Sequence, residues 1–175
     1  MFITVHAAAA TIIGQHISSP ILAFILGLIS HAILDIIPHG DQEMGKKFFK
    51  FRFHHSEAEE LKEEEDTAKT SLRAMALYGL IDLFALVFFV MYLFRNFQFT
   101  NIDSVIWAII GGIIPDILVG LYVIGKIKPL KGFFDLHTAN HYIAIKKIGK
   151  DMPLMVGMLM QVVIMITCVW MIVVN

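Results

Sequence analysis

The stretch SHAILDIIPHGD, residues 30–41, closes a long apolar run and holds four side chains that can bind metal. His31 and Asp35 are four residues apart, so they lie on one face if this segment is helical. A proline and a glycine then end the helix, and His39 and Asp41 follow on the turn. Because polar groups in an apolar helix are costly unless they bind an ion or one another, the stretch predicts a site at a helix end.

The composition is that of a membrane protein. The chain has 175 residues, enough for one domain, and 57% of them are hydrophobic. Soluble domains average roughly 45–50% apolar residues. We therefore predict an all-α fold, a multi-pass membrane bundle of four or five spans in a single domain over residues 1–175. The net charge of −1 gives no reason to expect a nucleic-acid partner, and the single cysteine, Cys168, is expected to pack in an apolar helix.

The hydrophobic runs set the limits of the predicted helices, which are about 2–15, 20–37, 71–94, 102–124 and 153–174. The first helix is near or below the roughly 17–25 residues that a span needs, so it is either a tilted span or a re-entrant piece. Between the predicted spans lie a polar insert, 38–70, and a basic loop, 125–151.

The polar insert combines two kinds of charge. Residues 46–53 alternate basic residues with phenylalanines, which is typical of an amphipathic segment at a membrane interface. Ser56 and Glu59 fit a capping box, so a helix is expected to begin there. We interpret the acidic run 57–66 as a solvated helix face.

The distribution of lysine and arginine predicts the topology. These residues concentrate in the insert and in the basic loop, whereas the loop between the third and fourth predicted helices has only Arg95. The positive-inside rule then puts both basic segments in the cytoplasm, and the N-terminus as well if the first helix spans. No basic region precedes the first apolar run, so a cleaved signal peptide is not expected. We expect a multi-pass protein of the inner cell membrane.

This topology gathers most polar side chains of the apolar segments at the cytoplasmic face, with Gln15 and His16 as exceptions in the outer turn. Polar residues without a shared role would not gather at one depth of the membrane, so we predict that these side chains form one metal site. Its predicted ligands are His6, His31, Asp35, Asp116, His137 and His141. We predict that His39 and Asp41 are further ligands or the catalytic acid and base groups.

Zinc prefers imidazole and carboxylate ligands, whereas manganese and iron favour sites with more oxygen ligands. We expect a divalent metal, zinc first, with manganese and iron as alternatives. The set is large enough for two ions bridged by carboxylates, an arrangement that clamps both oxygens of a phosphoester during hydrolysis. At a membrane face the expected substrate is a phospholipid or another phosphorylated amphiphile, and residues 46–53 would hold its anionic group.

Each of these polar residues also has a structural interpretation. His31 with Asp35 fits an intrahelical pair, and Asp116 fits a proline kink with a satisfied carboxylate. His6 fits a hydrogen bond between two helices. Asp82, near the middle of the third predicted helix, is interpreted as a structural partner of another helix.

Four sequence features together resemble a known family. They are His6 before a helix of small residues, the Ser-His-x-x-x-Asp segment 30–35, the Ile-Pro-Asp segment 114–116 and the His-x-x-x-His segment 137–141. With these features the chain resembles the bacterial inner-membrane proteins known as membrane-bound metal-dependent hydrolases and, more distantly, the zinc-dependent phospholipase C superfamily. It differs in having no second aspartate after Asp116 and no Arg-Gly pair between the late histidines. The resemblance implies metal-dependent hydrolysis.

Two classes of function follow from these observations. The first is a metal-dependent hydrolase at the cytoplasmic membrane face, acting on a phosphoester. The second is a non-enzymatic protein that handles metal ions or protons, or has a structural role, with the same cluster. A polar path that continues past Asp82 to the outer face would favour the second class, and an outer half closed by apolar side chains would favour the first.

Overall fold

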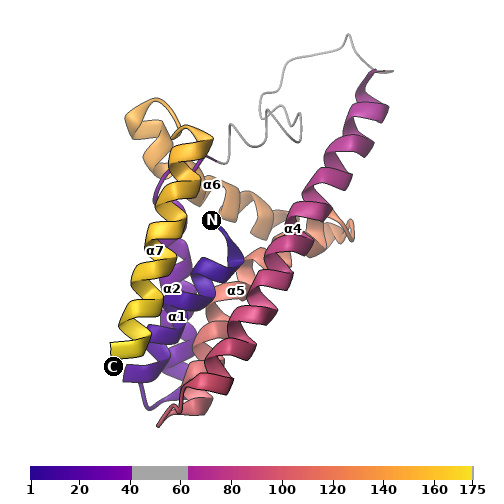
Figure 1. Ribbon diagram of the computed structural model, residues 1–175. Helices are drawn as coiled ribbons and strands as arrows, with labels where there is room; N and C mark the ends of the chain where they lie inside the picture. Colours follow the sequence, from indigo (N-terminus) through magenta and orange to yellow (C-terminus); the bar gives the residue numbers. More distant parts are fainter. Residues whose placement is uncertain (41–62, 175) are drawn as a thin grey trace.

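The chain folds into helices and short connections over the residues that the structure describes. This computed structural model describes residues 1–40 and 63–174, and for residues 63–76 it describes the backbone alone. Its helices are α1 (Ile3–His16), α2 (Pro20–Ile36), α4 (Glu63–Asn96), α5 (Ile102–Val123), the short 3-10 helix η2 (Lys128–Leu130), α6 (Lys131–Ile148) and α7 (Leu154–Val174) (Figure 1). The predicted all-α fold is confirmed.

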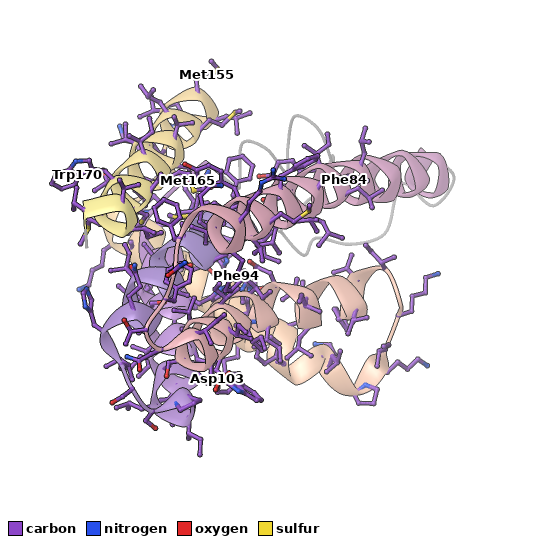
Figure 2. All side chains as sticks on the ribbon, turned by 60° about the horizontal axis from the view of Figure 1, so that its bottom comes forward. Phe84, Phe94, Asp103, Met155, Met165 and Trp170 are labelled. Carbon is purple, nitrogen blue, oxygen red and sulfur yellow. The ribbon has the colours of Figure 1, made fainter. Side chains whose placement is uncertain are left out.

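Among the described residues, three helical segments are long and apolar enough to cross a membrane: Leu77–Asn96, Ile102–Val123 and Leu154–Val174. Their outward side chains are apolar: Phe88 is 70% exposed, and Met155 is 75% exposed. Figure 2 shows Met155 and Trp170 on the outside of α7, away from the bundle. Because soluble proteins rarely expose so much contiguous apolar surface, these helices indicate a membrane protein.

Two further apolar helices are shorter. The α2 helix has 17 residues and α1 has 14, against the roughly 20 that a span needs. The α2 helix nevertheless exposes Ile21 and Ile33, at 75% and 58%, in the manner of the longer helices. The count of four or five spans stays a prediction.

Some predicted boundaries shift. The α4 helix begins at Glu63, earlier than residue 71, and the basic segment predicted as a loop contains α6, which ends at Gly149 in the left-handed conformation with φ of +80°. The predictions for Asp41, the amphipathic segment 46–53 and the capping box concern residues outside the described ones.

The ends of the helices form two groups, one at each end of the bundle. The start of α4, the whole of α6 and the start of α7 lie at one end of the bundle, and the α1–α2 and α4–α5 turns lie at the other (Figure 1). The start of α4, which carries Lys69 and Arg73, and the basic helix α6 therefore lie at the same end. This is the arrangement that the positive-inside rule requires, and the orientation itself stays a prediction.

Small residues let α1, α2 and α5 pack closely. A Cβ atom at Gly27 would overlap the carbonyl oxygen of Ala108, and one at Gly111 would overlap that of Phe24, so α2 and α5 touch through their backbones. On α1, Ala7 and Ala10 are fully buried. In lipid, where the hydrophobic effect does not drive helices together, such close contact is the main source of packing energy.

The first turn of α1 is capped by two other helices. The Asp82 carboxylate on α4 accepts hydrogen bonds from the backbone N–H of Ile3 at 2.7 Å and from the hydroxyl of Thr4 at 2.7 Å. The side-chain oxygen of Gln161 on α7 accepts one from the N–H of Phe2 at 2.7 Å. Unpaired amides are costly inside a membrane, so these contacts fix the position of α1. Asp82 thus acts as a structural partner, in agreement with its sequence interpretation.

We expect Asp82→Ala to lower the free energy of unfolding by about 1–3 kcal/mol, the cost of leaving a buried donor without its acceptor. Thermal unfolding of the purified protein in detergent measures this change. Asp135→Ala is the matched control, because its carboxylate is exposed and pairs with Lys131 at the surface. Equal loss of stability in the two variants would contradict the capping role.

Candidate metal centre

Four helices bring all six predicted metal ligands to one place at the end of the bundle. The contributing side chains are His6 from α1, His31 and Asp35 from α2, Asp116 from α5, and His137 and His141 from α6. More than 100 positions of sequence separate His31 from His137, yet their Nε2 atoms are 3.1 Å apart. The convergence expected from depth along the membrane is therefore observed. The role of these residues as ligands stays a prediction.

The Asp35 carboxylate lies at the centre of the cluster and is fully buried. Its Oδ2 atom is 2.9 Å from Nε2 of His31, 3.0 Å from Nε2 of His141 and 3.3 Å from Nε2 of His137. Its Oδ1 atom is 3.1 Å from Nε2 of His6 and also contacts the amino group of Met1. The intrahelical pair with His31 exists, but it is one contact among several.

Asp116 brings a second carboxylate from the opposite side. Its Oδ1 atom is 3.5 Å from Nε2 of His137 and 4.0 Å from Nε2 of His31, and its Oδ2 atom is 3.9 Å from Nε2 of His6. These separations are longer than good hydrogen bonds, so the carboxylate is not simply satisfied at a kink. They fit side chains arranged around a common point.

Backbone carbonyls fix the orientation of two imidazole rings. Nδ1 of His31 lies 2.8 Å from the carbonyl oxygen of Gly112, and Nδ1 of His39 lies 2.6 Å from that of Ile37. A carbonyl can only accept, so each Nδ1 carries the proton and donates it. The lone pair of each neutral ring is therefore on Nε2, which is the tautomer that a metal ligand needs.

The cluster contains more acceptors than donors. Buried side-chain atoms that make no well-aligned hydrogen bond include Nε2 of His6, Oδ2 of Asp35 and Oδ2 of Asp116. The rings of His6 and His31 are stacked with their centroids 4.0 Å apart. Such a concentration of lone pairs is unfavourable unless a cation lies among them, and this chemistry fits a divalent metal.

The carboxylates dominate the local electrostatics. Burial lowers the pKa of the His137 imidazole, but the neighbouring carboxylates of Asp116 and Asp35 outweigh that effect and raise the pKa to about 9. The centre therefore favours positive charge strongly, whether from protons or from a metal ion.

Two groups in the described part of the chain have the spacing of metal ligands. The first contains His31, Asp35, Asp116 and His137, and the second contains Asp35, His39 and His141. Within each group the ligand atoms all lie within 4.8 Å of one another. Thus His39, predicted as a ligand or as a catalytic group, lies beside the cluster, and its other predicted partner, Asp41, is outside the described residues.

The accessible edge of the centre is formed by α5 and α6. The side chains of His6 and Asp35 have no exposed surface, whereas those of Asp116, His137 and His141 are 23%, 11% and 15% exposed. A substrate or an exchanging ion would therefore approach on this side.

Three supporting residues were not identified from the sequence. The side chain of Asn140 donates to the carbonyl of Ala32 at 2.8 Å and holds α6 on α2. Gln161 caps α1, and Gly157 of α7 packs against the backbone of His39. Gln161 had a readable signal, because it is a polar residue in an otherwise apolar helix. His16, in contrast, is the last residue of α1 and is exposed at the far end of the bundle.

Comparison of the chain with protein-family models, with curated proteins and with solved structures finds no match.

We expect Zn²⁺ to stabilise the protein by about 2.7 kcal/mol when the free ion is at 100 times its dissociation constant, because the ion binds the folded chain. His31→Ala and Asp116→Ala should each lose most of this gain, and His16→Ala, the matched control, should keep it. Thermal unfolding with and without the ion measures the effect. A wild type that no divalent ion stabilises would contradict the metal centre.

Proposed function

We propose that the protein is a membrane-embedded metal-dependent hydrolase that acts at the cytoplasmic membrane face on a phosphoester, with a phospholipid-like amphiphile as the substrate. The observation that carries this proposal is the convergence of four imidazoles and two carboxylates, from four helices, at one end of an apolar bundle. A purely structural role would need far fewer buried polar side chains, because each of them is expensive inside a membrane.

The chemistry of the centre follows from its ligands. When bound there, a divalent metal would supply Lewis-acid activation of a phosphoryl group and of water. Zinc is our first choice because the ligands are mostly nitrogen, and manganese and iron are alternatives. The chain would hold the ion with His6, His31, Asp35, Asp116, His137 and His141, and His39 and Asp41 are proposed as further ligands or as the acid and base groups.

The position of the centre suits a substrate with a polar head and an apolar tail. Its accessible edge lies beside α6, whose outer side chains Leu136 and Ile143 are 70% and 46% exposed. The same helix ends with the exposed Lys146 and Lys147. Apolar contacts and basic residues together favour an amphiphile with an anionic head group, which supports a membrane lipid as the partner.

The arrangement of apolar residues supports a hydrolase over an ion or proton relay. Between the centre and the outer end, the described core is mostly apolar, with side chains such as Ala8, Leu93, Val105 and Ile172 nearly or fully buried. The buried Thr11 and Ser104 add hydroxyl groups there but no ionisable group. Asp82 does not continue a polar path outward, because its carboxylate caps α1. A relay needs a chain of polar groups across the membrane, whereas a hydrolase needs access from one face.

The proposed orientation can be tested by cysteine labelling in intact cells. In a Cys168→Ser background, Gln98→Cys should react with a membrane-impermeant maleimide from outside. Lys147→Cys should react only after the cells are permeabilised, because α6 would face the cytoplasm. Both replaced side chains are exposed. The reverse pattern would place the centre on the outer face.

We expect the purified, zinc-loaded protein to release product from a soluble phosphodiester or from a short-chain phospholipid in mixed micelles. Asp116→Asn should lower kcat/KM by at least about 100-fold, the upper end of the loss seen when even an outer-shell partner of a metal is replaced. His16→Ala, remote from the centre, should retain wild-type activity. Release of phosphate or phosphorylated product measures turnover. A metal-loaded wild type that hydrolyses no phosphoester would refute the proposal.

A further inference from the structure

Asp35 belongs to both groups of potential ligands, and this sharing carries an inference about how many ions the centre holds. We propose that the centre binds two divalent cations that share the Asp35 carboxylate, and that His39 and His141 hold the second cation. The inference rests on the proposed metal centre and assigns His39 as a ligand in place of an acid or base group.

The two groups differ in the number of ligands. The first offers four side chains, His31, Asp35, Asp116 and His137, and the second offers three, Asp35, His39 and His141. Zinc sites with four protein ligands are usually closed and structural, whereas catalytic sites have three and keep a position for water or substrate. The four-ligand site should therefore hold its ion more tightly, and the three-ligand site should keep one coordination position open.

The second site is built on a rigid turn. Nδ1 of His39 donates to the carbonyl of Ile37 at 2.6 Å, so its Nε2 is the ligand atom. The next residue, Gly40, has φ of +89°, and its N–H donates to the Asp151 carboxylate at 3.2 Å. Gly157 leaves no room for a Cβ atom beside the backbone of His39, so α7 holds the turn in place.

His141 completes the second site from α6. Its Nε2 atom is 3.0 Å from Oδ2 of Asp35, and its ring centroid is 5.2 Å from that of His39. The same Oδ2 atom faces His31 and His137 of the first site. One carboxylate oxygen thus faces both ligand groups, which allows Asp35 to bridge two ions.

Charge balance favours an anionic substrate. The two ligand groups contain two carboxylates, and their other members are imidazoles. Two divalent cations would therefore leave an excess of positive charge in a buried site. A phosphodiester anion offsets this excess, whereas a neutral ester or amide does not.

The number of ions can be measured without any substrate. The full chain in detergent is equilibrated with Mn²⁺, freed of unbound ion by gel filtration, and analysed by elemental mass spectrometry and by electron paramagnetic resonance. We expect about two equivalents in the wild type and an exchange-coupled spectrum, since carboxylate-bridged ions lie about 3.5–4 Å apart. His39→Gln should retain about one equivalent, with the six-line spectrum of an isolated ion.

The variants distinguish a lost ligand from a lost fold. His141→Gln should also retain about one equivalent, and it replaces His39→Gln in the test if that variant does not fold. The control variant His16→Ala should bind both ions. One equivalent in the wild type at saturating Mn²⁺, or two coupled ions in both His39→Gln and His141→Gln, would overturn the two-cation centre. If the protein binds a single ion and hydrolyses a phosphoester, the two-cation centre is refuted and the proposed hydrolase function is retained. If it binds two ions and hydrolyses no phosphoester, the hydrolase function is refuted and the two-cation centre is retained.

Discussion

The buried carboxylate of Asp35 is the group on which the rest of the structure depends. Imidazoles from three helices surround it: His6 from α1, His31 from its own helix, and His137 and His141 from α6. A single buried carboxylate without partners would be strongly unfavourable, so the helices must meet at this point for it to be tolerated. The same requirement gathers the ligands. Fold and site are therefore not separable here, because the polar centre sets where the apolar helices converge.

Short side chains can meet only when their helices are close. Aspartate reaches a small distance from its backbone, and helices usually pack 8–10 Å apart. The contacts of Gly27 and Gly111 bring α2 and α5 nearer, and Gly112 supplies the carbonyl that orients His31. The small residues and the polar centre therefore depend on each other, because close helix packing brings the short side chains of the centre within contact distance.

The sequence predicted the bounds of α1, α2, α5 and α7 to within one residue, and it predicted that the polar side chains converge, but it missed α6. His31 and Asp35, and likewise His137 and His141, are spaced for one helix face, and the topology put both pairs at one depth. That reasoning needs only local periodicity and the distribution of charge. The capping of α1 by Asp82 and Gln161 joins residues far apart in sequence, so no local pattern specifies it. The number of spans is equally hard to read, because α1 and α2 are short and their depth depends on what they pack against.

The capping of α1 has a consequence for how the protein is made. The amides of its first turn find their acceptors on Asp82 and Gln161, which are synthesised later than α1. A chain emerging from the ribosome therefore has α1 long before it has the groups that satisfy it. Until α4 and α7 are present, those amides have no acceptor on the protein, and water or lipid head groups have to satisfy them. His6, the predicted ligand on α1, is therefore held in its final position only when α4 and α7 are both in place.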